Sequence, residues 1–128
     1  MKPATKDARP VHLDLATFKF PFAAITSILH RISGVVLFIA MPFLLYALQI
    51  SLSGNEGFVE LQNLFGQVFY KLLLFILIAA LVYHFCAGVK HLIMDIGYLE
   101  TLKSSRIAAV SLLVISLVLT LAVAGALL

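Results

Sequence analysis

The sequence predicts an all-α membrane protein with three transmembrane helices, its N-terminus inside and its C-terminus outside. Hydrophobic residues make up 62% of the 128 residues, charged residues make up 12%, and the mean hydropathy is +1.10. In a soluble globular domain the apolar share is about 45–50%. The chain also contains three apolar stretches, each longer than the roughly 20 residues that a helix needs to cross a bilayer. These observations predict a membrane protein in which three helices account for most of the chain.

The predicted spans cover approximately residues 22–51, 69–93 and 107–128. Together they form a three-helix membrane anchor over residues 21–128, and residues 1–20 form a polar segment at the inner membrane surface. This segment lacks an apolar core ahead of a small-residue cleavage site, so no signal peptide is predicted.

Local patterns predict where the helices begin and end. Leucine and phenylalanine recur at helical spacing from Phe58 to Phe69, which indicates that the second helix begins early, along the membrane interface. Gly97 is expected to end that helix, and Ser104 or Ser105 to cap the third.

The basic residues predict the orientation. Seven of the nine lie in the N-terminal segment or around the second connection, whereas the first connection, residues 52–68, has two glutamates and no lysine or arginine; the seven are Lys2, Lys6, Arg9, Lys19, Lys90, Lys103 and Arg106. Basic loops stay on the cytoplasmic side, or on the matrix side in a mitochondrion. Because these charges flank spans and form no patch, the net charge of +3 does not indicate nucleic-acid binding.

Two polar stripes interrupt the apolar helices. Each follows the spacing i, i+3 or i+4, i+7, which places its members on one helix face; they are Ser27, His30, Arg31 and Gly34 in the first span, and His84, Gly88, His91 and Asp95 in the second. Ionisable groups at membrane depth are costly and usually face a protein interior, a cofactor or water. Functional residues are therefore expected on these two stripes.

The two stripes are predicted to lie at the same depth. At 1.5 Å per residue, His30 lies roughly 12–15 Å along the first helix, and His84 lies about 16 Å and His91 about 6 Å from the inner end of the second. Both stripes then share the inner half of the membrane, with His84 the deepest group.

One interpretation of a deep histidine near shallower basic residues is a haem b site. A neutral imidazole of His84 would ligate the iron, its other N–H would be oriented by a carbonyl such as that of Ala80, and haem propionates would meet basic residues. Gly88 would leave room for the porphyrin.

Simpler interpretations remain open for each of these residues. His84 could be a buried histidine that is hydrogen-bonded to a neighbouring helix, and His30 and Arg31 could extend to the inner headgroups. His91 and Asp95 could be solvated helix-end residues, and His12 an exposed residue of the polar segment.

Several motifs carry a family resemblance. The stretch SILHRISG at residues 27–34, the pattern HxxxGxxHLxxD at residues 84–95 and RPxHLxL at residues 9–15 closely resemble the cytochrome b subunit of succinate dehydrogenase, the larger membrane anchor of respiratory complex II. The resemblance runs from about Arg9 to Glu100, includes DxGYLE at residues 95–100, and is closest to the bacterial form with two separate anchor subunits. It implies a location in the bacterial inner membrane.

The resemblance implies a role for each motif residue. His84 would be one axial ligand of haem b, and the second ligand would come from the other anchor subunit. Ser27 and Arg31 would line the ubiquinone pocket, and His30 would lie beside a haem propionate. Arg31 and His91 are also candidates for contacts to the haem, although His91 and Asp95 match the family in position more clearly than in role.

The resemblance also implies a succinate:ubiquinone oxidoreductase whose cofactors belong to different subunits. It implies that FAD belongs to a flavoprotein subunit and the iron–sulfur clusters to another. This chain has neither a GxGxxG motif nor a cysteine cluster for such groups. No activity is expected for the chain alone, and it carries no catalytic residue of its own. Two alternatives are the anchor of a fumarate reductase and a non-enzymatic protein that conducts protons through the same groups, although three spans without a repeat disfavour a self-sufficient carrier.

Overall fold

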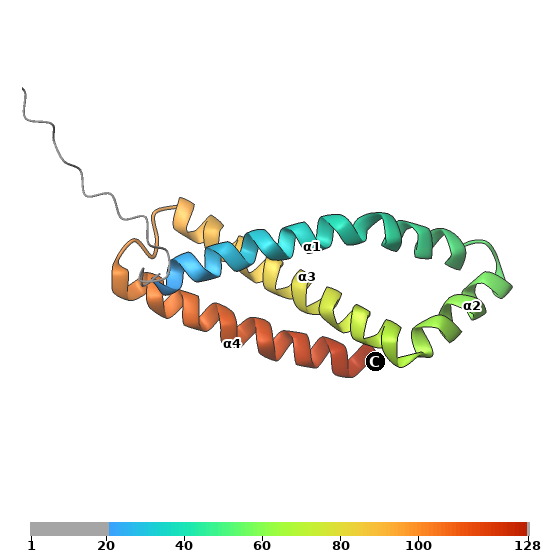
Figure 1. Ribbon diagram of the computed structural model, residues 1–128. Coiled ribbons are helices and arrows are strands. Elements are labelled where there is room, and N and C mark those ends of the chain that lie inside the picture. Colours follow the sequence, from blue (N-terminus) through green and yellow to red (C-terminus); the bar gives the residue numbers. More distant parts are fainter. Residues whose placement is uncertain (1–20, 128) are drawn as a thin grey trace, which may run out of the picture.

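The computed structural model describes residues 21–127, and over that range the chain is entirely helical between its turns (Figure 1). The four helices are α1 (Phe22–Ser51), α2 (Asn55–Gly66), α3 (Val68–Asp95) and α4 (Leu102–Leu127). The expectations for residues 1–20, including His12 and the RPxHLxL motif, and for Leu128 lie outside the described residues.

Three of these helices, α1, α3 and α4, are long and apolar enough to cross a membrane, with 30, 28 and 26 residues. The predicted all-α fold with three spans is therefore confirmed. The first span has the predicted bounds, whereas α3 extends slightly beyond residues 69–93 and α4 begins five residues before residue 107.

The amphipathic stretch after the first span forms a separate helix, so the prediction that it continues into the second span is wrong. Gln67 adopts an extended conformation, with φ −78° and ψ 141°, between α2 and α3. Gly66, which has no Cβ and a low helix propensity, immediately precedes this break. As a result α2 lies across the end of the bundle where α1 ends and α3 begins (Figure 1).

The turn from α3 to α4 uses two local capping motifs. Gly97 has φ +91° and donates to the Met94 carbonyl, and Tyr98 donates to the Ile93 carbonyl, which is the Schellman arrangement at a helix C-terminus. The prediction that Gly97 ends the helix is confirmed. The cap of the next helix is Thr101, whose Oγ1 accepts a hydrogen bond from the Ser104 backbone N–H at 3.1 Å.

That cap corrects the sequence prediction, which assigned the role to Ser104 or Ser105. The serine at 104 instead lies inside the first turn of α4, and its hydroxyl donates to the Thr101 carbonyl. The pattern was misread because the polar residues 103–106 belong to the helix and not to the loop before it.

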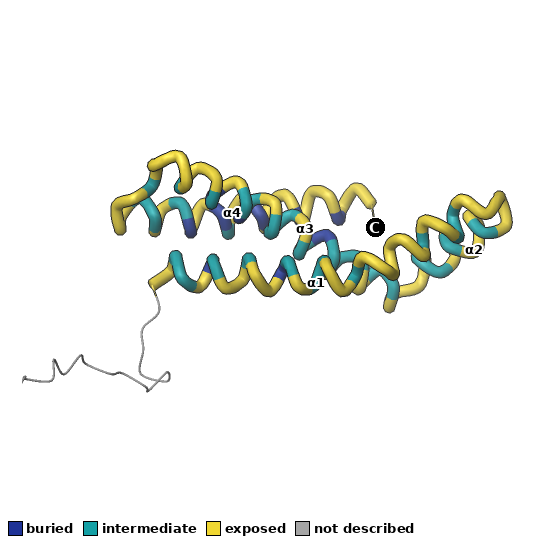
Figure 2. The backbone as a smooth tube through the Cα atoms, turned by 90° about the horizontal axis from the view of Figure 1, so that it is seen from above, coloured by how far each residue is buried: buried dark blue, intermediate teal, exposed yellow. Residues whose placement is uncertain are grey.

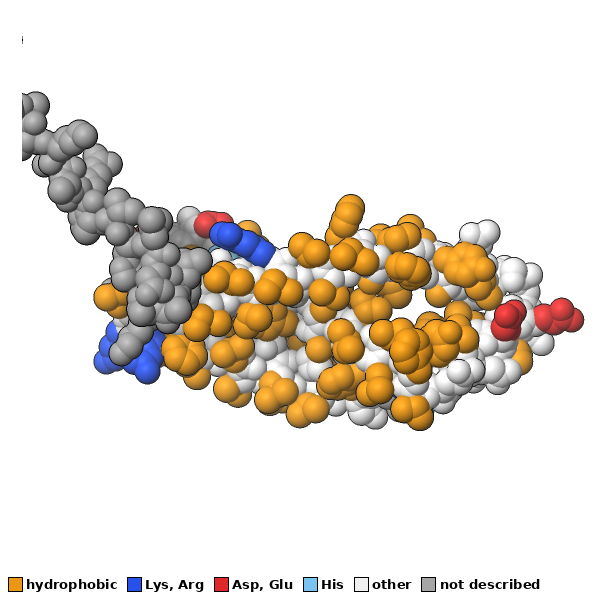
Figure 3. Space-filling view, viewed as in Figure 1, with side chains coloured by type: hydrophobic (Ala, Val, Ile, Leu, Met, Phe, Trp, Pro, Cys, Tyr) orange, Lys and Arg blue, Asp and Glu red, His pale blue; other side chains and the backbone are white. Residues whose placement is uncertain are grey.

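Helix α3 packs against both α1 and α4, and the tube in Figure 2 marks the few buried residues along these helices. Ala87 in α3 and Ala109 in α4 are almost completely buried, which lets the backbones approach closely. Most large apolar side chains instead cover the outer surface (Figure 3). Such an outside suits contact with lipid more than with water.

The three long helices diverge toward α2. An almost wholly apolar cavity of about 290 Å³ lies between α1, α2 and α3; its lining on α1 comes from residues after Pro42, and it is visible as a hollow in Figure 3. At the opposite end, the Arg106 guanidinium lies 6.0 Å from the centre of the Phe22 ring and joins the start of α4 to the start of α1. The tight end of the bundle is thus the one where α1 begins and α3 ends.

Candidate functional site

The two polar stripes meet between α1 and α3. The ring centroids of His30 and His84 are 4.2 Å apart with an interplanar angle of 28°, and those of His30 and His91 are 5.2 Å apart. His30 of α1 therefore lies against two histidines of α3. The prediction that the stripes lie at the same level of the bundle is confirmed.

One nitrogen of His84 is held by α1. His84 Nδ1 lies 3.1 Å from the backbone carbonyl oxygen of His30 and 3.1 Å from Ser33 Oγ. The Ser33 hydroxyl donates its proton to the same carbonyl at 2.8 Å, so it offers only lone pairs to the imidazole. Because a carbonyl oxygen cannot donate, Nδ1 carries the proton and donates to both oxygens.

This tautomer leaves the other nitrogen free. His84 Nε2 makes no hydrogen bond within residues 21–127 and, unlike His30 Nε2, is not among the fully enclosed polar atoms of that range. An unprotonated ring nitrogen whose partner N–H is fixed by a carbonyl is the usual form of a histidine that ligates a metal. The carbonyl is that of His30, on the neighbouring helix, and not that of Ala80 as expected.

Gly34 makes room for this imidazole. A Cβ at residue 34 would lie 2.9 Å from Cε1 of His84 and 3.4 Å from Nδ1, closer than side chains normally approach. The glycine in the first stripe is therefore required by the position of the His84 ring. On α3, Gly88 lies beneath His30, since a Cβ there would be 3.9 Å from His30 Nε2.

His30 has an unpartnered buried nitrogen. Its Nε2 is enclosed and has no hydrogen-bond partner within residues 21–127. A buried polar atom without a partner costs about 1–3 kcal/mol. This atom therefore marks a place where an acceptor or donor from outside this chain would be favourable.

The remaining predicted residues differ in exposure. Ser27 is half-buried and Arg31 is exposed, and neither has a hydrogen bond or ion pair within the described part of the chain. His91 is half-buried beside His30, so it is not simply a solvated helix-end residue, whereas Asp95 is exposed at the last position of α3.

Four residues of this region were missed by sequence reasoning. Ser33 fixes the His84 ring, and Thr26, Tyr83 and Lys90 form a second polar cluster between the helices. Lys90 was counted among the loop-flanking charges, yet its side chain is buried at 7% exposure. Its place within an apolar stretch, five residues before the end of α3, was the available indication.

The arrangement suits one axial position of a haem better than a metal site made by this chain alone. Among residues 21–127 there is no group of three or more His, Cys, Asp or Glu side chains that could hold a metal ion together. A single imidazole nitrogen, by contrast, is sufficient for one side of a haem iron. The free His84 Nε2, the room provided by Gly34 and the unpartnered His30 Nε2 all fit such a group.

Comparison with known proteins places these residues in a family context. Residues 5–123 match the family model described as the succinate dehydrogenase/fumarate reductase transmembrane subunit. The succinate dehydrogenase cytochrome b556 subunit of Coxiella burnetii is 43% identical over 86% of this chain and 89% of that protein. The corresponding subunit of Rickettsia felis is 34% identical over 88% of each chain. A mitochondrial relative, the cytochrome b560 subunit of Dictyostelium discoideum, is 28% identical over 80% of this chain and 51% of that protein.

Proposed function

This chain belongs to the family of succinate dehydrogenase/fumarate reductase transmembrane subunits, and we propose that it shares a haem b with a second anchor subunit and forms part of a ubiquinone-reduction site. It is a membrane-bound, multi-pass protein, and its bacterial relatives favour the inner membrane as its location. Those relatives are named as succinate dehydrogenase subunits, which favours succinate oxidation over the reverse reaction.

The observation that carries the haem proposal is the hydrogen bond from His84 Nδ1 to the His30 carbonyl. It fixes the tautomer that leaves Nε2 available as an axial ligand. A haem b bound at this nitrogen supplies a one-electron redox centre. The chain's own part is to hold the imidazole through the His30 carbonyl and Ser33, while the imidazole of His30 and the neighbouring His91 are candidates for contacts to the propionates.

The second axial ligand would come from another polypeptide. Within residues 21–127 there are two other imidazoles: the His30 ring stacks on the His84 ring, and the His91 ring is tilted against the His30 ring. Both rings would therefore lie beside His84 as contacts to a haem, and neither is assigned as the second ligand. A second anchor subunit would supply that ligand and would cover the polar face that this chain leaves open.

The quinone proposal rests on Ser27 and Arg31, which match the family motif and are available for external contacts. The Ser27 hydroxyl would donate a hydrogen bond to a quinone oxygen, and the Arg31 guanidinium would stabilise the negative charge that develops on that oxygen during reduction. Reduction to the quinol takes two electrons and two protons. The electrons would arrive from an iron–sulfur subunit, after succinate oxidation at the FAD of a flavoprotein subunit.

The test separates two activities of the assembled complex. Succinate oxidation with an artificial electron acceptor needs only the soluble subunits, whereas ubiquinone reduction also needs this site. Ser27→Ala should lower ubiquinone reduction about tenfold or more, because a hydrogen bond to a charged group contributes about 1.5–3 kcal/mol. Arg31→Leu should be at least as damaging, and Arg31→Lys should retain part of the rate because it keeps the charge.

Ser51→Ala is the matched control, because this serine also lies in α1 but bonds only the Leu48 carbonyl of its own helix. It should leave both activities unchanged. If Ser27→Ala and Arg31→Leu complexes assemble with normal haem and still reduce ubiquinone at the wild-type rate, the quinone proposal is wrong. A proton-conducting protein would instead lose membrane proton flux in these variants while quinone reduction stays normal.

A further inference from the structure

A second polar cluster lies beside the site and touches neither the proposed haem ligand nitrogen nor the proposed quinone contacts. It consists of three residues, each of which immediately precedes a site residue in the sequence: Thr26 before Ser27, Tyr83 before His84, and Lys90 before His91. This arrangement means that the cluster can act on the site through the backbone.

Two successive residues of α3 bond two carbonyls of α1. The Tyr83 hydroxyl donates to the Thr26 carbonyl at 2.9 Å, and His84 Nδ1 donates to the His30 carbonyl at 3.1 Å. The two carbonyls are four residues apart, which is about one helical turn. Two hydrogen bonds one turn apart fix both the axial position and the rotation of α1 against α3. With one hydrogen bond alone, α1 could still rotate about that contact.

Thr26 is the centre of the cluster. It is 1% exposed, and its hydroxyl donates to the Ala23 carbonyl at 3.0 Å, which leaves the oxygen lone pairs to accept from Lys90 Nζ at 3.4 Å. Within residues 21–127 this hydroxyl is the one hydrogen-bond partner of the Lys90 amino group. A buried amino group is costly without acceptors, so its contact with Thr26 adds a third constraint on α1.

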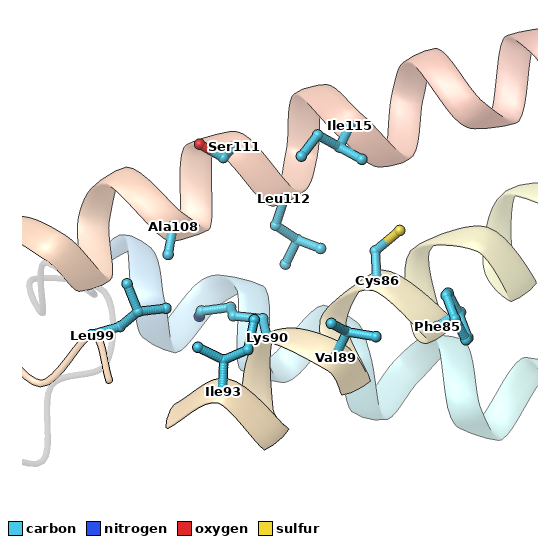
Figure 4. Close-up of a pocket in the computed structure, with 10 residues that line it drawn as sticks. All are labelled: Phe85, Cys86, Val89, Lys90, Ile93, Leu99, Ala108, Ser111, Leu112 and Ile115. Atoms are coloured by element: carbon cyan, nitrogen blue, oxygen red, sulfur yellow. The ribbon is translucent and has the colours of Figure 1, made fainter. Parts of the chain in front are cut away.

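The Lys90 side chain also lines a cavity between α3 and α4. Figure 4 shows it extending from α3 below Ala108 and Leu112 of α4, and these residues line a cavity of about 290 Å³ between α3 and α4. The remainder of the lining is mostly apolar. The amino group therefore has few alternatives to the Thr26 hydroxyl, and the contact links α1 to the packing of α3 on α4.

We propose that Thr26, Tyr83 and Lys90 are positioning residues that set the place of Ser27 on α1 relative to His84 on α3. This inference rests on the proposed function of Ser27 in quinone reduction. The cluster determines how far the Ser27 hydroxyl lies from the haem side of the site, and it does so by holding the α1 backbone at residue 26. Its loss should weaken productive quinone binding before it weakens assembly.

The test uses the assembled complex with Thr26→Val, which removes the hydroxyl at nearly constant volume, and Tyr83→Phe, which removes the donor to the Thr26 carbonyl. Each should lower kcat/KM for ubiquinone about three- to tenfold, the effect of one ordinary hydrogen bond, while succinate oxidation with an artificial acceptor stays normal. Thr26→Ser, which keeps the hydroxyl, should restore most of the rate. Tyr83→Phe should also shift the haem absorption spectrum, because residue 83 adjoins the proposed ligand.

A double-mutant cycle tests the lysine. If Lys90 acts through the Thr26 hydroxyl, the effects of Lys90→Met and Thr26→Val should be non-additive, and the double variant should resemble the more impaired single variant. Additive effects would exclude Lys90 from the cluster.

Two matched controls carry the same substitutions elsewhere. Thr120→Val lies at a buried position toward the far end of α4, and Tyr70→Phe lies in the first turn of α3; both should leave ubiquinone kinetics unchanged. If the complex that carries Thr26→Val does not assemble, the kinetics of the Tyr83→Phe complex test the positioning role, because this substitution keeps the aromatic ring. Wild-type kinetics in both cluster variants, with Ser27→Ala still impaired, would overturn the positioning role alone. Wild-type kinetics in Ser27→Ala as well would overturn the proposed quinone function.

Discussion

Replacing Gly34 with alanine should displace the His84 imidazole and disturb haem binding. The added Cβ would lie 2.9 Å from His84 Cε1, whereas ordinary contacts begin at 3.4 Å, so the ring must move by at least the difference, 0.5 Å. The movement is directed away from α1. The hydrogen bonds from Nδ1 to the His30 carbonyl and to Ser33 Oγ, both 3.1 Å, would then lengthen to about 3.6 Å, beyond the range of a hydrogen bond.

The substitution should reduce the free energy of unfolding only modestly, whereas it should clearly displace the His84 imidazole. Overpacking of a well-packed contact costs about 1–3 kcal/mol, and the higher helix propensity of alanine returns up to about 1 kcal/mol. Because these two terms partly cancel, the variant complex should still assemble. The position and tautomer of the imidazole, by contrast, depend directly on the two bonds that the substitution breaks.

The assay is the reduced-minus-oxidised absorption spectrum of the purified complex, together with its haem content per complex. Gly34→Ala should show a diminished or shifted b-type spectrum at normal subunit composition. Gly125→Ala in α4 is the control, because a Cβ there would meet nothing within 4 Å. A Gly34→Ala complex with the haem content, spectrum and reduction potential of the wild type would show that His84 is not held as the structure indicates.

Two further predictions concern the ligand itself and the capping of α4. His84→Leu should abolish or alter the low-spin b-type spectrum, with a milder change for His30→Leu, and an unchanged spectrum in His84→Leu would exclude it as a ligand. Thr101→Ala should destabilise the chain by about 0.5–2 kcal/mol through loss of the cap, as measured by the thermal unfolding of the complex, whereas Thr101→Ser should remain near the wild type; equal stability of the two variants would contradict the cap.

The sequence was sufficient to predict the three spans and the common level of the two polar stripes. Span prediction depends on length and composition, and those are explicit in the sequence. The common level of His30, His84 and His91 followed from the rise per residue and from an antiparallel pair of helices, whereas their ring contacts are known from the structure. Both arguments use only quantities that do not depend on how individual side chains pack.

The sequence was not sufficient to predict the residues that hold the stripes in place. The partner of His84 Nδ1 is a backbone carbonyl, and every residue has one, so no pattern distinguishes His30 from Ala80 as its source. Lys90 was misread for a related reason, since its charge suggested a loop border while its long side chain could reach Thr26 inside the bundle. Gln67 and Thr101 were missed because helix ends depend on local backbone angles and single capping bonds.

The two interpretations of His84 that the sequence left open do not exclude each other. An imidazole has two nitrogens, and the structure assigns one of them, Nδ1, to the neighbouring helix. The bond to the His30 carbonyl is therefore both an ordinary contact between helices and the interaction that leaves Nε2 unprotonated. It follows that the packing of α1 on α3 selects the nitrogen that is offered to a metal, and that any change which separates these helices should weaken coordination even where His84 itself is intact.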